Sequence, residues 1–460
     1  MTTNNLIENI LNIKNIHKEN RLSLDVCDDF LNMLPSLTRK HSVGENASFL
    51  EFMGRPDMNM KIIHVAGTNG KGSVCNFLSS ILVQAGFHAG MFTSPHLVKI
   101  TERFKIDGKD ITDDVFTASF LKILDYIESY QKSEEGLRNF FPSYFEYLFF
   151  MAMDIYKDSR IDYLVLETGL GGLLDVTNAI EKPLACIITE IGFDHMQYLG
   201  NTYEEIASHK AGIIKENVPV IFWDKRKEST KVIKDTAAKM NARTRCITEA
   251  NISNVKLLEG TCGNKHVDFC FDSEYYNYVG LCLRTAARYQ TQNAALAISC
   301  IEELSILGGI SISPNDIIKG LLNAIWPCRM EEISPGFIVD GAHNTDGMEA
   351  FLKSAGDIEC NGSKILLFGA VSDKQYRQMA SMILESGIFD KIIACCLKTG
   401  RSLNMDALKE AFYGADNVLF CDSVEDAVSY IFSIKKEKDL IFAAGSLYLA
   451  GQLREKDSSI

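Results

Sequence analysis

The ten residues His64-Val65-Ala66-Gly67-Thr68-Asn69-Gly70-Lys71-Gly72-Ser73 decide how the first part of this chain folds. An apolar segment, 61–66, leads into the glycines, and a helix-like segment, 74–85, follows them. Glycines let backbone N–H groups turn toward an anion, a helix N-terminus adds positive partial charge, and Lys71 adds a full charge. The stretch therefore predicts a phosphate-binding loop. Because Gly72 stands where such loops usually carry the hydroxyl that holds magnesium, that hydroxyl must come from Ser73 or from elsewhere.

Apolar strands and amphipathic helices alternate after this loop, which predicts a doubly wound, mostly parallel sheet. Between residues 245 and 283 the pattern changes to short alternating runs, and these predict antiparallel strands added at an edge. The expected strands are 61–66, 88–92, 162–166, 184–189 and 219–222, and the expected helices are 74–85, 113–130, 143–157, 203–215 and 286–307.

A second, smaller domain is expected after Trp326-Pro327, which interrupt the pattern. We place the boundary between residues 1–324, an ATP-binding domain, and residues 325–460, a Rossmann-like α/β domain. The alternation resumes there, with strands expected at 337–339, 364–368, 391–395 and 440–444.

Composition narrows the class of partner. Of 460 residues, 46% are hydrophobic and 23% are charged, which is typical of a globular protein, and the formal charge of −13 argues against nucleic acid as a partner. An anionic substrate would therefore have to meet local cations or a metal ion. The 13 cysteines lack a CxxC pair, which favours a reducing, cytoplasmic location, and no apolar run is long enough to span a bilayer.

Polar side chains follow three further strands, at the edge where an open parallel sheet binds ligands. Ser94 follows 88–92, Glu167 follows 162–166, and His195 lies shortly after 184–189. Ser94 and Glu167 offer the oxygen ligands that Mg²⁺ prefers, whereas imidazole is an unusual ligand for that ion. The residues alone leave two alternatives open: Glu167 as a turn or helix-capping carboxylate, and His195 as a structural histidine.

Lys210 falls on the apolar stripe of the helix expected at 203–215, four residues after Ile206 and three before Ile213. An inward lysine is rare unless it is paired or modified. A lysine that bends outward at the edge of the stripe is the alternative.

In the second domain, the strand at 337–339 ends in Asp340, and Gly341-Ala342-His343-Asn344 follow it. Arg329 comes just before this strand, close to the expected boundary. A cation at that place could reach a phosphate held by the first domain, or it could form a surface salt bridge.

Together these motifs resemble folylpolyglutamate synthase, including the bifunctional dihydrofolate synthases, within the Mur ligase superfamily. They occur in the order of that family across nearly the whole chain. The motifs are HVAGTNGKGS at 64–73, FTSPHL at 92–97, ERFKIDG at 102–108, ETGLGGLLDVTN at 167–178, GFDH at 192–195, KAGIIK at 210–215, QTQNAALA at 290–297, WPCRME at 326–331, DGAHN at 340–344 and GSLYLAG at 445–451.

The resemblance implies a cytoplasmic, monomeric, ATP-dependent ligase that joins L-glutamate to a folate or to dihydropteroate through an acyl phosphate. It implies two Mg²⁺ ions, one bound by Ser94 and Glu167 and one by His195, with Lys210 carrying a carbamate that also binds metal. Lys71, Lys210 and His343 would be catalytic. The implied ATP-binding residues are Thr68, Asn69, Gly70, Lys71, Gly72, Ser73, Gln290, Asn293, Arg329 and Asp340, and the implied folate-binding residues are Pro95, His96 and Arg103.

Four residues depart from the usual pattern of that family. Leu173 replaces a common arginine, Tyr289 a histidine, His209 a glutamate, and Cys328 the glycine of WPGR. None removes an implied metal or phosphate contact. The remaining alternatives are another Mur-type ligase, acting on a cell-wall precursor, and a P-loop NTPase module without ligase activity. The choice between dihydropteroate and tetrahydrofolate as acceptor stays open.

Overall fold

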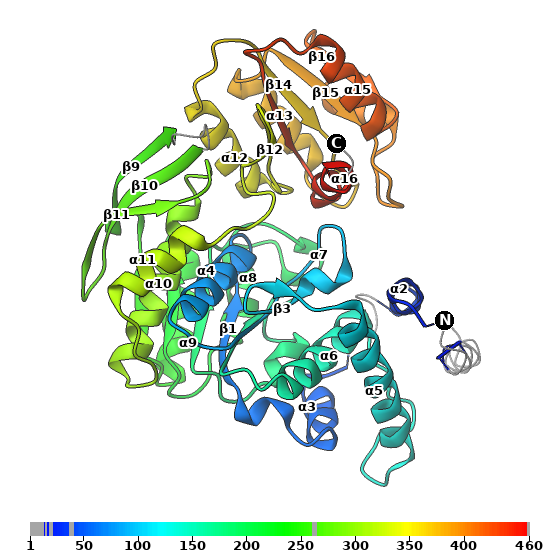
Figure 1. The fold of residues 1–460 in the computed structure, drawn as a ribbon, viewed down its shortest axis with the longest axis vertical. Coiled ribbons are helices and arrows are strands. Elements are labelled where there is room, and N and C mark those ends of the chain that lie inside the picture. Colours follow the sequence, from blue (N-terminus) through cyan, green and yellow to red (C-terminus); the bar gives the residue numbers. More distant parts are fainter. Residues whose placement is uncertain (1–12, 14–15, 18–21, 36–40, 260–264, 458–460) are drawn as a thin grey trace.

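The computed structural model describes residues 13, 16–17, 22–35, 41–259 and 265–457, which form two α/β domains one above the other (Figure 1). The central domain contains the blue to green part of the chain, and the C-terminal domain the yellow to red part. No helix in these ranges is long and apolar enough to cross a membrane. The expected α/β class is confirmed.

Eight strands of the described residues form the central sheet, in the order β4-β3-β2-β5-β1-β6-β7-β8. Strands β2 and β5 through β8 run parallel to β1, whereas β3 and β4 form an antiparallel edge. The strands are β1 (Lys61–Ala66), β2 (Ala89–Phe92), β3 (Phe104–Ile106), β4 (Lys109–Asp110), β5 (Tyr163–Glu167), β6 (Ala185–Ile188), β7 (Val220–Trp223) and β8 (Thr244–Ile247).

Strand β1 lies near the middle of this sheet, and both of its faces are buried. Ile63 and Val65 pack with α4, α10 and α11 on one face, and Ile62 packs with α2, α3, α5 and α6 on the other. Helices α8 and α9 cover that second face beside β6 and β7. The helices are α2 (Leu24–Asn32), α3 (Val43–Phe52), α4 (Lys71–Gln84), α5 (Asp113–Lys132), α6 (Tyr144–Asp158), α7 (Met196–Leu199), α8 (Tyr203–Ala211), α9 (Lys227–Lys239), α10 (Gln290–Ile306) and α11 (Pro314–Asn323).

The strands expected between 245 and 283 are antiparallel, but they form a sheet of their own rather than extending the central one. Its order is β11-β10-β9, with β9 (Ile252–Glu259), β10 (Lys265–Asp272) and β11 (Asn277–Leu283). Their apolar face packs on α10 and α11, because side chains of β10 and β11 belong to the same hydrophobic core as those helices. The alternation of apolar and polar residues indicates that a segment is a half-buried strand, but it does not indicate which sheet the strand joins.

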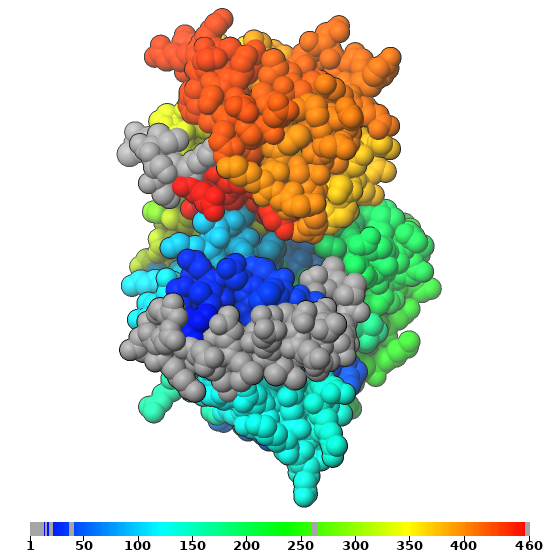
Figure 2. All heavy atoms as spheres, turned by 90° about the vertical axis from the view of Figure 1, so that its right-hand side faces the viewer, coloured from blue at the N-terminus to red at the C-terminus, as the bar shows by residue number. Residues whose placement is uncertain are grey.

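The C-terminal domain has a sheet of the order β12-β13-β17-β14-β15-β16, in which only β12 is antiparallel. In Figure 2 this domain, drawn in orange and red, covers the upper end of the central domain. Its elements are β12 (Glu331–Ser334), β13 (Phe337–Val339), α12 (Thr345–Asp357), β14 (Lys364–Phe368), α13 (Tyr376–Ser386), β15 (Lys391–Cys395), α14 (Met405–Ala411), β16 (Val418–Cys421), α15 (Val424–Ile434), β17 (Leu440–Ala444) and α16 (Leu447–Asp457).

Several helix boundaries differ from the expectation by a few residues. The helix expected at 203–215 ends at Ala211, and the helix expected at 286–307 begins at Gln290. Helix α11 begins with Pro314. Proline suits the first helical position because its missing N–H is unpaired there in any case. Helix α11 ends at Asn323 and β12 begins at Glu331, so the expected division at residue 324 falls in the segment between them. That division stays a prediction.

Candidate active site

A cavity of about 530 Å³ lies between the two domains, beyond the carboxyl ends of the central strands. Both domains line it, and most of the residues expected at the site are present. Those lining residues are Thr68, Asn69, Gly70, Lys71, Gly72, Ser73, Ser94, Pro95, Arg103, Glu167, His195, Lys210, Asn293, Arg329, Asp340 and His343. His96 and Gln290 do not line it, although each contacts a residue that does.

The phosphate loop is fixed by close neighbours that leave no room for side chains at its glycines. A Cβ atom at Gly67 would overlap Thr189, and one at Gly70, whose φ is +87°, would overlap the Asn293 amide. A Cβ at Gly72 would come within 2.8 Å of the Trp326 ring. This contact explains why glycine, and not serine or threonine, follows Lys71.

The Ser73 hydroxyl is already engaged in a buried chain of hydrogen bonds with Gln290 and Asn293. It is buried and accepts a hydrogen bond of 3.1 Å from Gln290 Nε2, and Gln290 Oε1 in turn accepts one of 2.8 Å from Asn293 Nδ2. The sequence left open whether a metal-binding hydroxyl comes from Ser73 or from elsewhere, and this hydrogen bond makes Ser73 the less available source.

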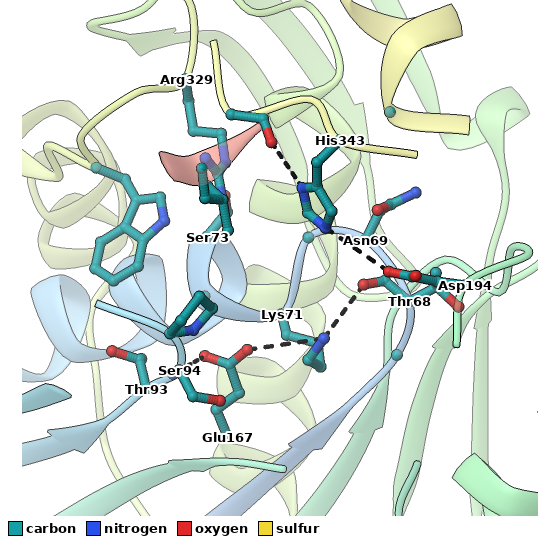
Figure 3. A pocket seen from close by; sticks show the side chains of 18 of the residues that line it. Thr68, Asn69, Lys71, Ser73, Thr93, Ser94, Glu167, Asp194, Arg329 and His343 are labelled. Atoms are coloured by element: carbon teal, nitrogen blue, oxygen red, sulfur yellow. Dashed lines mark hydrogen bonds and ion pairs between the residues drawn. The ribbon is translucent and has the colours of Figure 1, made fainter. Parts of the chain in front are cut away.

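Glu167 and Lys71 lie side by side in the cavity (Figure 3). Lys71 Nζ is 3.8 Å from Glu167 Oε1 and donates to the Thr68 carbonyl at 3.2 Å, while Glu167 Oε2 accepts from the Ser94 backbone N–H at 3.1 Å. Burial raises the pKa of Glu167 to about 7, and the charge of Lys71 opposes that rise. Because Lys71 only partly offsets the cost of burying this negative charge, a second cation beside Glu167 would stabilise its ionised form.

Lys210 points inward from α8, as its place on the apolar stripe predicted. It is 3% exposed, and Nζ donates a hydrogen bond of 2.6 Å to the Gly67 carbonyl, directly under the phosphate loop. Burial, reinforced by the charge of Lys71, lowers the pKa of Lys210 to about 7. A large share of this amine is therefore neutral and nucleophilic near neutral pH.

His195 directly precedes α7 and has a φ of +50°, next to the largely buried carboxylate of Asp194. Burial lowers the pKa of His195 to about 4, so the ring is neutral and able to bind a metal. Burial would raise the pKa of Asp194, but the hydrogen bond from His343 and the charge of Lys374 outweigh it and lower that pKa. Lys374 Nζ is 2.5 Å from Asp194 Oδ1, and His343 Nε2 is 3.7 Å from Asp194 Oδ2.

Asp194, Lys374 and Asn344 join the domains at the cavity, and the sequence assigned no role to them. Asn344 Nδ2 donates to Asn69 Oδ1 at 2.9 Å, and Asn69 Nδ2 donates back to Asn344 Oδ1 at 3.3 Å. The only available signal was that Asp194 lies in the GFDH motif and Asn344 in DGAHN. Lys374 lies in a loop after β14 that carries no such pattern.

Asp340 is buried at the domain boundary and already has three donors. Its Oδ2 accepts from the Tyr289 hydroxyl at 2.6 Å and from the Met330 N–H at 3.0 Å, and its Oδ1 accepts from the Ala342 N–H at 2.8 Å. Arg329 Nη1 donates to the Cys328 carbonyl at 2.9 Å, beside Gly341.

Arg103 and His96, which follow Ser94 in the chain, are joined by a hydrogen bond. Arg103 Nε donates to His96 Nδ1 at 2.9 Å, and the guanidinium lies over the Tyr144 ring at 5.5 Å. Burial, with the charge of Arg103, lowers the pKa of His96 to about 3, so this imidazole is neutral. A flat guanidinium beside aromatic rings suits an aromatic, anionic ligand.

Comparison with known proteins agrees with this geometry. Residues 142–301 match the Mur ligase middle domain, and residues 328–447 match the Mur ligase glutamate ligase domain. The chain is 32% identical to the dihydrofolate synthase/folylpolyglutamate synthase of Bacillus subtilis over 91% of its length and 95% of that protein.

The chain belongs to the folylpolyglutamate synthase/dihydrofolate synthase family.

Solved structures place this Mur-type ligase in the same family. A structure of E. coli FolC in complex with DHPP and ADP has a TM-score of 0.82 at 27% identity, covering 95% of this chain and 98% of that one. The folylpolyglutamate synthase of Thermotoga maritima has a TM-score of 0.76 at 30% identity, covering 94% and 96%.

The structure shows the surroundings of the four residues that depart from the family pattern. Tyr289 holds Asp340, and Cys328 adopts a φ of +55°, the left-handed conformation that favours glycine. The Leu173 side chain is 46% exposed, and its backbone N–H donates to the His209 carbonyl at 2.7 Å. Leu173 and His209 therefore meet through the backbone.

A buried network under the site supports the Gly169–Gly172 loop of the ligase. Asp175 Oδ2 accepts from the Leu170 N–H at 2.9 Å, and Thr177 Oγ1 donates to Asp175 Oδ1 at 2.7 Å. His64 Nε2 lies 2.9 Å from Thr177 Oγ1. Because the hydroxyl hydrogen of Thr177 is already donated to Asp175, His64 Nε2 must be the protonated nitrogen and donate to Thr177 Oγ1. His64 Nδ1 is buried without a partner, and burial lowers the pKa of His64 to about 3.

We predict that His64→Gln weakens the pH dependence of stability below pH 7. The unfolded chain binds a proton on His64 near pH 6.5 while the folded protein does not, so stability is lost as the pH falls. Between pH 7 and pH 5 the wild type should lose about 2 kcal/mol more free energy of unfolding than the variant. Denaturant unfolding followed by tryptophan fluorescence measures this difference, and parallel pH profiles would contradict it.

Proposed function

We propose that this protein joins L-glutamate to a folate in an ATP-dependent reaction that passes through an acyl phosphate. The observation that supports this most is the cavity between the domains, where the glycine-rich loop with the half-buried Lys71, the buried Glu167 carboxylate and the buried Lys210 meet. The relatives named above are ligases of this kind, and one was solved with ADP and DHPP.

The chemistry requires charge stabilisation at one place. A carboxylate is a poor electrophile, and its phosphorylation by ATP supplies a leaving group that the glutamate amine displaces. Negative charge grows on the transferring phosphoryl group and later on the tetrahedral intermediate. In our proposal Lys71 stabilises the phosphoryl group, and His343, which faces Asp194 across the domain boundary, acts at the reaction zone.

We further propose that two Mg²⁺ ions act at this site. Ser94 and Glu167 fit one of them, because the partly compensated Glu167 carboxylate and the Ser94 hydroxyl are the oxygen donors that this ion prefers. His195 would hold the second ion. Lys210 would bind carbon dioxide as a carbamate, for which its neutral amine is suited, and would then offer oxygen ligands. The ions supply charge neutralisation at the phosphates.

The remaining roles follow from position in the cavity. We propose that ATP lies along Thr68, Asn69, Gly70, Gly72 and Ser73, with Asn293 and Arg329 beside it and Asp340 at the ribose. Gln290 would act through Ser73 and Asn293, since it does not line the cavity. The folate would lie against Pro95 and Arg103, with His96 positioning the Arg103 guanidinium.

A second activity on dihydropteroate is proposed because the Bacillus subtilis relative carries both names and spans nearly the same length. The monomeric state and the cytoplasmic location are further proposals. The deciding assay measures phosphate release with ATP, Mg²⁺ and glutamate, and compares tetrahydrofolate with dihydropteroate. We expect release with either acceptor, and only when glutamate is present. ATP hydrolysis that is indifferent to acceptor and glutamate would refute the ligase proposal.

We predict that Lys71→Ala lowers kcat on the order of 1,000-fold, because it removes a charge that acts on the transferring phosphoryl group. The fold should be retained, since Lys71 lies at the edge of the cavity. Initial rates and circular dichroism measure the two effects, and Lys157→Ala, in the exposed last turn of α6, is the control. A variant with near-normal turnover would rule out this role for Lys71.

We predict that Lys210→Ala is inactive and is partly rescued by small carboxylates such as acetate. These ions can occupy the space of the lost carbamate and supply its oxygen atoms to the metal ions. The measurement is kcat as a function of acetate concentration, with Lys71→Ala as the matched variant that acetate should not rescue. Equal responses of the two variants would argue against a carbamate at Lys210.

A further inference from the structure

The outer sheet β11-β10-β9 lies at the left of Figure 1. Buried and more exposed residues alternate along β10 and β11, so the sheet has one apolar and one polar face. Phe269 and Phe271 of β10 and Leu281 and Leu283 of β11 point into the core of the central domain. Successive side chains of a strand point to opposite faces, so His266, Asp268 and Cys282 share the other face. None of these three residues lines the cavity proposed for catalysis.

The three side chains come together because the sheet holds them in register. Asp268 and Cys282 are directly paired across β10 and β11, and His266 lies two residues before Asp268 on the same strand. One ligand atom from each residue lies within 4.8 Å of the other two, and His266 Nε2 is 3.8 Å from Asp268 Oδ1. Asp268 Oδ1 is shielded from solvent and has no hydrogen-bond partner.

These distances are close to those of a metal site. Bonds of about 2.0–2.3 Å to nitrogen, oxygen and sulfur around a tetrahedral zinc ion put neighbouring ligand atoms about 3.3–3.8 Å apart. The measured separations need only small side-chain rotations to reach that range. The Asp268 oxygen, which lacks a donor, is the atom that would gain most from a cation.

We propose that His266, Asp268 and Cys282 form a binding site for a transition-metal ion of intermediate softness, such as Zn²⁺. A nitrogen, an oxygen and a sulfur ligand select such an ion over Mg²⁺ or Ca²⁺, which prefer oxygen alone. The site is separate from the ligase chemistry and does not rest on it.

The fourth coordination position faces open space. His266 and Cys282 line a second cavity of about 690 Å³, which also borders Trp326 and Arg329 in the segment between the domains. Water or another small ligand can therefore complete the coordination. Lys256, which pairs with Asp268 across β9, and Arg284 are both exposed, so their charges can turn toward solvent.

Metal binding must displace the thiol proton of Cys282. Burial, with the hydrogen bond to Asp268, raises the pKa of Cys282 to about 11, so the thiol is protonated before the metal binds. Formation of the metal–sulfur bond releases that proton to solvent, as at other cysteine sites.

Titration of the purified protein with Co²⁺, in excess Mg²⁺, tests the proposal. Cobalt reports its own ligands, because a thiolate gives a near-ultraviolet charge-transfer band that oxygen ligands do not give. We expect this band in the wild type, its loss in Cys282→Ser, and binding weakened by about 100-fold or more in His266→Ala. Zn²⁺ should displace Co²⁺ and abolish the band.

Cys270→Ser is the matched control, because Cys270 lies on β10 with His266 and Asp268 but outside the cluster. This variant should keep the band. Asp268→Asn provides a second test if Cys282→Ser fails to fold, and it should remove the rise in thermal unfolding midpoint that Zn²⁺ gives the wild type. A wild type without the band, or a band that persists in Cys282→Ser, would overturn the proposal.

Discussion

The burial of opposite charges under the phosphate loop is the constraint on which this site depends. Glu167 and Lys210 are buried, and Lys71 is half-buried, where the carboxyl ends of β1 and β5 meet α8 beside the cavity. Burial raises the pKa of the carboxyl and lowers that of the inner lysine, so neither group is fully stabilised as an ion by the protein alone. Such a site gains free energy from phosphates and cations that complete the charge pattern.

The second domain completes the site. The mutual amide pair of Asn69 and Asn344 joins the phosphate loop directly to the start of α12. Lys374 of the C-terminal domain neutralises Asp194, the neighbour of His195. A relative shift of the two domains would therefore change the charge around His195 and the position of the loop together. The contacts of His195 and of the glycine-rich loop are thus tied to the way the two domains meet.

The segment between the domains also connects the active site to the outer sheet. Trp326 packs against Gly72 of the phosphate loop, and both Trp326 and Arg329 border the second cavity, which His266 and Cys282 line. A ligand bound at His266 and Cys282 would therefore share this second cavity with Trp326, which contacts the phosphate loop at Gly72. The antiparallel sheet is more than a covering for α10 and α11, because its outer face carries polar groups close to this linking segment.

The sequence by itself determined the α/β class, the glycine-rich turn between β1 and α4, and the family, because local periodicity and short motifs are properties of neighbouring residues. It also placed Lys210 inward, since the 3.6-residue period of a helix fixes which side chains share a face. Which sheet the strands after residue 245 join, and the contacts of Asp194 with Lys374 and of Asn69 with Asn344, depended on the tertiary structure. These contacts join residues 180 and 275 positions apart, and no local pattern encodes how two domains meet. The same holds for Gly72, whose missing side chain is explained only by the Trp326 ring packed against it.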